Sequence, residues 1–283
     1  MQNQQQVASQ SKPKDNIESL LQKMKPALMS ALPKHLTADR FLRVALTELR
    51  GNPKLMQCDQ MSFLRSVMFC AQLGLEPGGV LGHCYLLPFE NRKKGITECQ
   101  FILGYKGMLN LTRRSGEISS ITSHTVHADD TFEFEFGLDE KLVHIPSLSQ
   151  PRTKDNMVGV YAIAKFVGGG YQMDFMSSAE VEDIKSRSKA SSFGPWVTDY
   201  LEMAKKTAIR RIFKYLPVSI EALTAASLDE AADRGEQKIE LDNVFSPVME
   251  SLEHQVDPET GEITPAEAAL KSAADKLADK IEG

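Results

Sequence analysis

The sequence lacks the features of an exported, membrane-spanning or disulfide-linked protein. Among its 283 residues, no apolar run approaches the roughly 20 residues that a membrane-spanning helix needs. Residues 1–14 are rich in glutamine and lysine and contain no apolar signal segment. The four cysteines, at positions 58, 70, 84 and 99, are too widely spaced for a Cys-x-x-Cys pair. They indicate neither an oxidising compartment nor a zinc knuckle, so we expect a cytoplasmic protein.

The signatures of common enzyme classes are missing as well. No Gly-Lys-Ser/Thr occurs, so there is no Walker A loop, and neither a Gly-x-Ser-x-Gly elbow nor a His-Glu-x-x-His pair is present. Gly78, Gly79 and Gly82 resemble a phosphate-binding loop only superficially, because a turn that leads into the next strand explains them. ATP hydrolysis is therefore not expected, and a hydrolase is weakly supported.

A metal site is disfavoured by the predicted geometry of its candidate ligands. His124 and His127 fall on a predicted strand, where side chains three residues apart point to opposite faces, so they do not converge with Asp129 and Asp130. Glu133 and Glu135 alternate with phenylalanines and are explained by a solvent-facing side of a strand. We predict no catalytic residue, no metal and no cofactor.

The net charge of −5 hides a split along the chain. Residues 221–283 carry 16 acidic and 5 basic residues, a net of −11, which leaves a net of +6 for the first 220 residues. Within those, Lys185 to Lys214 contains eight basic residues against Asp199 and Glu202. A basic body with an acidic tail favours a polyanion-binding domain followed by a segment with another task. A solvated surface with a disordered end is the alternative.

Hydrophobic periodicity predicts helices first, then mostly strands, then helices again. We expect helices at 17–32 with a bend or an interruption at Pro26, at 37–49, and from Asp59 to Gly74. Strands at 81–89 and 98–105 are expected to form a hairpin, followed by a helix at 105–114. Further strands are predicted at 118–127, 132–145 (with a turn near Gly137), 158–167 and 171–176, and further helices at 178–188, 195–215 and 265–281. This order, without βαβ alternation, indicates the α+β class.

The helix at 195–215 carries the strongest candidate site. Val197, Leu201, Ala204, Ala208 and Tyr215 form its predicted core stripe. Lys206, Arg210 and Lys214 fall on the opposite side at i, i+4 and i+8, about 6 Å apart along the axis, a spacing comparable with neighbouring phosphates. Lys205 and Arg211 flank the core stripe, where each could instead pair with carboxylates inside the fold. A solvated face is the alternative for the whole row.

Aromatic residues accompany the cations. Phe193 and Trp196 stand at the start of this helix, and Tyr105 opens the shorter helix that contains Lys106 and ends at Arg114. Cations interleaved with aromatic side chains are typical of single-strand binding, where the charges follow the backbone and the rings stack on bases. Core packing is the alternative for each ring; Trp196 is predicted to lie away from the core stripe.

Seven motifs together resemble one family. They are Leu73–Gly78 (LGLEPG), Leu81–Phe89 (LGHCYLLPF), Gly104–Gly107 (GYKG), Arg113–Gly116 (RRSG), Phe134–Leu142 (FEFGLDEKL), Gly194–Thr198 (GPWVT) and Glu202–Arg211 (EMAKKTAIRR). The chain resembles, over roughly residues 25–222, the RecT family of phage and prophage single-strand annealing proteins. The last block is the most specific of these motifs.

The resemblance implies a function and an architecture. We expect ATP-independent binding of single-stranded DNA and annealing of complementary strands in homologous recombination, without covalent catalysis. The implied core is a β-hairpin, a three-stranded antiparallel sheet and a long helix, assembled into a homo-oligomeric ring or helical filament with the DNA in a continuous basic groove. A partner exonuclease and the single-strand-binding protein of the bacterial host are the implied protein partners.

The resemblance also implies site residues. Lys205, Lys206, Arg210 and Arg211 match the basic helix of the family, and Lys106, Arg113 and Arg114 match its Tyr-Lys-Gly helix. We expect Lys106, Arg113, Lys206 and Arg210 to be the foremost phosphate ligands, with Arg114, Lys205, Arg211 and Lys214 as further DNA-binding residues. Tyr105, Phe193 and Trp196 are the candidates for base stacking, and Arg92, Lys93 and Lys94 of the hairpin turn are possible auxiliaries.

Three segments are expected: a disordered arm at 1–14, a core for DNA binding, annealing and oligomerisation at 15–222, and an acidic tail at 223–283. Thr264 and Glu267 form a capping box for a short helix in the tail, with Leu270, Ala274, Leu277 and Ile281 as its apolar stripe. We interpret this helix as a docking segment for the exonuclease or the single-strand-binding protein. An acidic shield of the groove and disorder without a role are the alternatives. A metal-dependent nuclease and a scaffold that binds no DNA are the rival classes for the whole protein.

Overall fold

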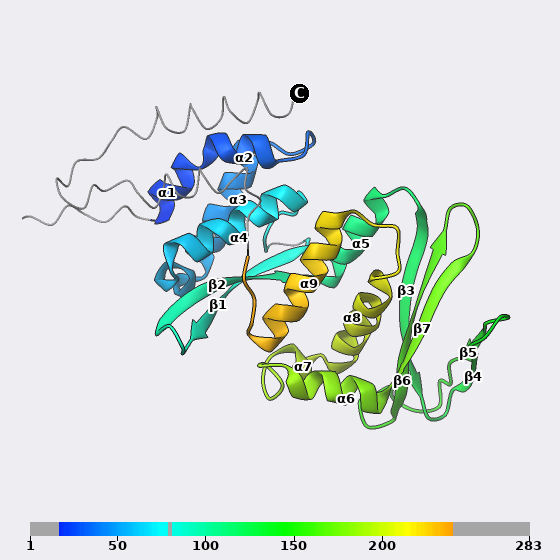
Figure 1. The fold of residues 1–283 in the computed structure, drawn as a ribbon. Coiled ribbons are helices and arrows are strands. Elements are labelled where there is room, and N and C mark those ends of the chain that lie inside the picture. Colours follow the sequence, from blue (N-terminus) through cyan, green and yellow to red (C-terminus); the bar gives the residue numbers. More distant parts are fainter. Residues whose placement is uncertain (1–16, 79–80, 240–283) are drawn as a thin grey trace, which may run out of the picture.

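The N-terminal part of the chain is a group of helices around a buried fourth helix. The computed structural model describes residues 17–78 and 81–239 (Figure 1). Its first elements are α1 (Ile17–Lys23), α2 (Lys25–Ala31), α3 (Ala38–Gly51), a 3₁₀ turn η1 (Pro53–Gln57) and α4 (Gln60–Leu73). The interruption expected at Pro26 is present: residues 17–31 form two helices, because proline is tolerated only in the first turn of a helix and Pro26 lies in the first turn of α2. The predicted ends of α4 are confirmed: Asp59 accepts a hydrogen bond from Ser62 N, and Gly74 ends the helix with a φ of 58°.

A two-stranded hairpin follows, β1 (Cys84–Asn91) and β2 (Ile96–Leu103). Two side chains, one from α4 and one from the segment after α9, satisfy the outer edge of β2. Ser62 Oγ of α4 accepts from Cys99 N at 2.8 Å, and the Gln237 side chain bonds both the N–H and the carbonyl of Phe101. The hairpin is thereby held between the N-terminal helices and the C-terminal part of the described chain.

The second half of the fold is a three-stranded antiparallel sheet with a helix packed on it. β3 (Ile118–His127), β6 (Met157–Phe166) and β7 (Tyr171–Ser177) pair in the order β3-β6-β7. Helix α8 (Tyr200–Phe213) packs against all three strands. Around it lie α5 (Tyr105–Arg114), α6 (Ser178–Arg187) and α7 (Pro195–Thr198). The predicted α+β class, with its hairpin, three-stranded sheet and packed helix, is confirmed.

A second small hairpin, β4 (Thr131–Glu135) and β5 (Lys141–Ile145), projects beyond the three-stranded sheet (Figure 1). The alternation predicted for residues 132–136 is present as far as Glu135: Phe132 and Phe134 are half-buried, and Glu133 and Glu135 are exposed, whereas Phe136 follows the strand and is itself exposed. The Phe132 ring lies 5.2 Å from Phe175 and 6.1 Å from Tyr161, centroid to centroid. These contacts fix the base of the hairpin on the face of the sheet.

The helix α9 (Ile220–Arg234) was not expected from the sequence. Ser219 caps its start, Gly235 ends it with a φ of 71°, and it buries Ala222, Ala225 and Ala226. Alanine gives a weak apolar stripe, which is why the periodicity did not mark this segment. The boundary predicted after residue 222 lies inside α9, so the first part of the expected tail belongs to the folded core. The arm at 1–14 and the helix at 265–281 lie outside the described residues.

The helix predicted at 195–215 is interrupted at Asp199, whose φ of −137° and ψ of 47° are not helical. The four residues of α7 therefore do not continue the helical phase of α8. Within the two described ranges, no helix is both long and apolar enough to cross a membrane.

Asp130 is a buried carboxylate that organises the turn between β3 and β4. Its side chain is fully buried and accepts hydrogen bonds from Arg152 at 3.0 Å and from His144 Nε2 at 2.9 Å. The backbone N–H groups of His127 and Ser147 donate to it as well. Burial opposes ionisation of Asp130, but the hydrogen bonds from Arg152 and His144 outweigh it and hold the pKa of Asp130 well below its ordinary value.

One of the histidines that the sequence offered as metal ligands, His127, has other partners in the structure. His127 is hydrogen-bonded to Asn156 and Thr125. Across residues 17–78 and 81–239, no group of three histidine, cysteine, aspartate or glutamate side chains is placed to hold a metal ion.

Asp130→Ala is expected to lower the free energy of unfolding by about 3–5 kcal/mol at pH 7, because Arg152 then loses its buried partner. A carboxylate with a depressed folded pKa contributes stability above its unfolded pKa and loses it as the pH falls. The difference between wild type and variant should therefore shrink below about pH 4, by at most about 1.4 kcal/mol per pH unit. Urea titrations at several pH values measure this. Asp155→Ala, at an exposed position, is the control, and a difference that stays constant down to pH 2 would contradict the assignment.

Candidate nucleic-acid interface

The two foremost cations of α8 are not on a solvent-facing side. Lys206 Nζ lies 2.9 Å from Asp229 of α9, and Arg210 lies 3.1 Å from Asp229 and 2.6 Å from Asp233. Arg210 is only 7% exposed. The prediction that Lys206 and Arg210 lie on the side of this helix away from the core is wrong, because α9 lies against this side of α8 (Figure 1).

Asp229 is the centre of this buried network. Its side chain is fully buried, and it accepts from Lys206, from Arg210 and from the N–H of Leu103 in β2. Burial disfavours the charge of Arg210, but Asp229 and Asp233 outweigh this effect and raise the pKa of Arg210. One carboxylate therefore joins α9, α8 and the first hairpin.

The other three cations, Lys205 and Arg211 of α8 and Lys214 at its C-cap, are nearer the surface. Lys205 pairs with Glu202 at 2.7 Å, Lys214 approaches Glu230 at 3.6 Å, and Arg211 bonds two carboxylates, Asp174 at 2.7 Å and Glu180 at 2.8 Å. Lys205 and Arg211 do pair with carboxylates, but Lys205 does so at the surface of its own helix and not inside the fold, whereas Arg211 bonds residues of β7 and α6. Exposed pairs of this kind contribute only about 0–1 kcal/mol each, so a phosphate can compete for these cations.

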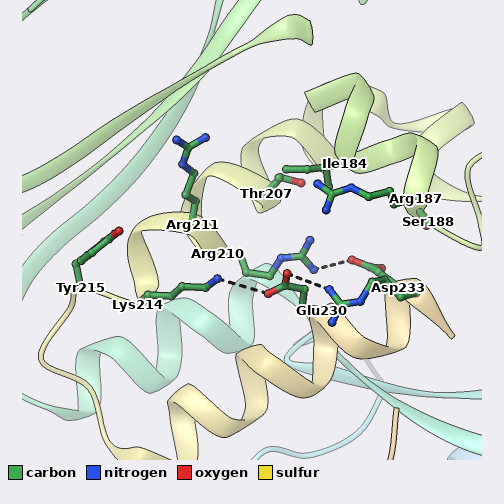
Figure 2. A pocket seen from close by; sticks show the side chains of 11 residues that line it. Ile184, Arg187, Ser188, Thr207, Arg210, Arg211, Lys214, Tyr215, Glu230 and Asp233 are labelled. Atoms are coloured by element: carbon green, nitrogen blue, oxygen red, sulfur yellow. Dashed lines mark hydrogen bonds and ion pairs between the residues drawn. The ribbon is translucent and has the colours of Figure 1, made fainter. Parts of the chain in front are cut away.

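A pocket of about 300 Å³ lies between α6, α8 and α9 (Figure 2). Figure 2 shows Arg210 directed toward Asp233 and Lys214 toward Glu230 across this pocket. Its charged lining consists of Arg187, Arg210, Arg211, Lys214, Arg234, Glu230 and Asp233. Five cations against two carboxylates give the lining an excess of positive charge.

Helix α5 carries two cations of a different kind. Lys106 and Arg113 are exposed, and neither forms an ion pair with any residue that the structure describes. At i and i+7 they share one face of the helix, about 10.5 Å apart along its axis. Asn110 lies between them on this face, and its Oδ1 is buried without a hydrogen-bond partner in the described ranges. We call Lys106, Asn110 and Arg113 the α5 face.

The start of α5 is held against the chain that precedes the first hairpin. Gly104 N donates to His83 O at 2.9 Å. A Cβ atom on Gly107 would lie 2.1 Å from the same carbonyl oxygen, so only glycine permits this approach. The Gly-Tyr-Lys-Gly motif thus positions Tyr105 and Lys106 at the surface.

Arg114 has a structural task next to the α5 face. Its guanidinium donates to the carbonyl oxygens of Leu73 and Gly74 at the end of α4, and burial lowers its pKa. These bonds satisfy carbonyls that the end of a helix leaves unpaired. The guanidinium predicted as a DNA ligand is therefore used to join α5 to α4.

The three aromatic candidates are placed differently from one another. Tyr105 is 42% exposed at the first residue of α5, and Phe193 is 62% exposed before α7. Trp196 is 2% exposed and packs with its ring centroid 5.9 Å from that of Tyr200. The prediction that Trp196 lies away from the core is wrong, because the break at Asp199 removes the helical phase on which it rested.

The sequence reasoning missed Asn110 and the carboxylates of α9. A polar stripe at i, i+4 and i+7 along residues 106–113 was the available signal for Asn110. For Asp229 and Asp233 the signal was their spacing of four residues, which matches that of Lys206 and Arg210.

In the turn of the first hairpin, Lys94 pairs with Glu98 at 2.7 Å and Arg92 approaches Glu90 at 3.6 Å.

Comparison with known proteins shows which family the chain belongs to. The family model described as "RecT family" matches residues 39–243, which is most of the chain and includes α9. The chain belongs to the RecT family. This membership confirms the resemblance and supports a role in DNA recombination and single-strand annealing.

Two bacterial relatives agree with this assignment. The chain is 52% identical to Protein RecT of Escherichia coli strain K12 over 209 residues, which cover 73% of this chain and 77% of that protein. It is 25% identical to the uncharacterized protein YqaK of Bacillus subtilis strain 168 over 206 residues, covering 73% and 68% of the two chains.

Asp229→Ala is expected to destabilise the fold by at least about 3 kcal/mol, because Lys206 and Arg210 would remain buried without their shared carboxylate. Glu230→Ala, which removes a partly exposed carboxylate one residue away, should cost less than about 1 kcal/mol. Denaturant unfolding of both variants measures the difference. Equal stabilities would show that the Asp229 network does not hold α9 on α8.

Proposed function

We propose that this RecT-family chain binds single-stranded DNA on the α5 face and anneals complementary strands without ATP. The observation that carries this proposal is the state of Lys106 and Arg113. Both cations are exposed and have no carboxylate partner among the described residues, whereas the predicted cations of α8 are all engaged in ion pairs. A cation that is paired with a carboxylate must break that ion pair before it binds a phosphate. Lys106 and Arg113 have no such pair to break.

The chemistry follows from charge and stacking. Lys106 and Arg113 bind backbone phosphates at two points along a strand, and binding releases the counterions that the strand had condensed. The exposed ring of Tyr105 offers a stacking surface at one end of this face, which is worth about 1–3 kcal/mol per base in single-strand binding.

Annealing needs two strands whose phosphates repel each other. Fixed cations lower this repulsion, so that complementary bases can meet while the backbones stay bound. Correct pairing retains both strands as a duplex, and mismatched strands dissociate. Sequence is then read by base pairing, and the protein supplies position and charge. Assembly of copies into a homo-oligomer, as a ring or filament, would align many such faces along one strand.

The pocket between α6, α8 and α9 is the second element of the proposed DNA path. Arg211 and Lys214 are 41% and 65% exposed at the level of the side chain, and each can exchange its carboxylate for a phosphate. Lys206 and Arg210 do not contact the strand in this proposal. They add positive charge near the pocket, and their ion pairs with Asp229 hold α9 in place. The relatives named above come from bacteria, so we place the reaction in a bacterial cell.

The double substitution Lys106→Ala with Arg113→Ala is expected to slow annealing and to weaken binding of a thymidine oligonucleotide. Each lost phosphate contact should reduce the slope of log K against log salt concentration by about 0.7 for a single strand, so the double variant should lose about 1.4. Fluorescence anisotropy over a salt series measures this slope.

Lys165→Ala removes another exposed lysine, on β6, and is the matched control. An unchanged slope and annealing rate in the double variant would contradict the proposed role of the α5 face. A scaffold that binds no DNA would show no binding even at low salt.

The segment after residue 239 is proposed to recruit protein partners. Residues 240–283 contain 11 acidic and 3 basic residues, a net of −8, which disfavours contact with DNA. We propose that this segment docks the partner exonuclease or the single-strand-binding protein of the host. Because α9 belongs to the core, a test of the tail has to start after it.

Deletion of residues 240–283 is expected to leave the annealing rate of naked oligonucleotides within about twofold and to impair recombination in cells. Deletion from residue 225 should instead abolish folding, because it removes Asp229 and the edge contacts of Gln237. Annealing assays and circular dichroism on both deletions measure this. Loss of naked-strand annealing in the shorter deletion would contradict the docking role.

A further inference from the structure

The β4–β5 hairpin exposes large apolar side chains at its end. Phe136 is 63% exposed and Leu138 is fully exposed, and we call these two residues the apolar tip. Figure 1 shows the hairpin extending away from the rest of the molecule. Burying a phenylalanine or leucine side chain removes a large apolar area from water, so a projecting pair of this kind indicates a contact surface.

The hairpin presents this tip from a rigid base. Its two strands pair over five successive positions, from Thr131 with Ile145 to Glu135 with Lys141. Phe134 contacts both Phe136 and Phe175, with centroid distances of 4.5 and 5.3 Å. Because the base is tied to the sheet, little conformational freedom would be lost when the tip is buried.

Charge decides which class of partner fits. Residues 131–145 carry four carboxylates, at 133, 135, 139 and 140, against Lys141, a net of −3. This charge repels DNA, and it repels the residues 240–283 of the same chain, whose net is −8. The occupant must therefore be a basic protein surface with apolar side chains of its own.

The opposite end of this same chain offers such a surface. The β1–β2 hairpin carries Arg92, Lys93 and Lys94 against Glu90 and Glu98, a net of +1. Residues 17–74 beside it carry eight basic and four acidic residues, a net of +4. Leu87 and Ile96 are 46% and 39% exposed and share one face of this hairpin by its register. We call Leu87, Ile96, Arg92 and Lys93 the receiving surface.

We propose that the apolar tip of one copy docks on the receiving surface of the next copy. The inference rests on the homo-oligomer proposed above and names the surfaces that build it. The two hairpins lie at opposite ends of the molecule (Figure 1), so each copy offers one unlike surface at each end. Such a head-to-tail contact repeats, and it yields a ring where the rotation closes and a helical filament where it does not.

The test uses two full-length variants that each destroy one end. Phe136→Ser with Leu138→Ser removes the apolar tip, and Leu87→Ser with Arg92→Glu and Lys93→Glu removes the receiving surface. Sedimentation velocity, with and without a thymidine oligonucleotide, gives their assembly state. Each variant alone should be monomeric, and a 1:1 mixture should stop at a dimer, because one intact pair of surfaces remains. Ile220→Ser, another exposed apolar position, is the control and should assemble like wild type.

A second pair of variants covers the case in which the first does not fold. Glu135→Lys with Asp139→Lys should dissociate the assembly, and adding Arg92→Glu with Lys93→Glu in the same chain should restore it. The inference is overturned if wild type is monomeric in both conditions, if the tip variants assemble like wild type, or if the mixture stays monomeric.

These outcomes are separate from those of the annealing proposal. A wild type that assembles as described but fails to pair complementary strands would overturn the proposed function alone. If the variants of the apolar tip and the receiving surface anneal strands and also assemble like wild type, the proposed docking contact alone is overturned.

Discussion

The arrangement of the described chain depends on one buried carboxylate, Asp229. It is reached by a lysine and an arginine of α8 and by a backbone N–H of β2, so it fixes three elements at one point. A buried ion group of this kind stabilises less than its Coulomb energy suggests, but removing one member leaves the others unpaired at high cost. The need to keep Lys206 and Arg210 paired with Asp229 therefore fixes the position of α9, and α9 covers one side of α8.

The cations predicted to bind DNA therefore fall into three groups. Lys206 and Arg210 serve the fold, and the surface cations of α8 keep exchangeable partners. Lys106 and Arg113 on α5 stay available, because the described carboxylates lie elsewhere. A basic motif alone therefore does not locate a phosphate site. What distinguishes a ligand from a structural cation is whether a carboxylate of the same fold already satisfies it.

Local signals predicted much of this fold from the sequence. The cap at Asp59, the end at Gly74 and the alternation along residues 132–135 depend on near neighbours, and the structure has all three. The helix α9 and the burial of Trp196 were missed, because alanines give a weak stripe and one non-helical residue changes the phase. The pairing of Arg210 with Asp229 depends on how α8 and α9 pack against each other, and the hydrophobic periodicity of each helix does not predict that packing.

The most direct test of the account is the rate at which the pure, full-length protein pairs two complementary oligonucleotides. The reaction should contain EDTA and no nucleotide, and it should be repeated over a range of salt concentrations. If annealing needs only fixed positive charge, pairing should be strongly accelerated over the protein-free rate, and the acceleration should fall as salt rises. No acceleration, or acceleration that appears only when nucleotide or a divalent metal is restored, would contradict it.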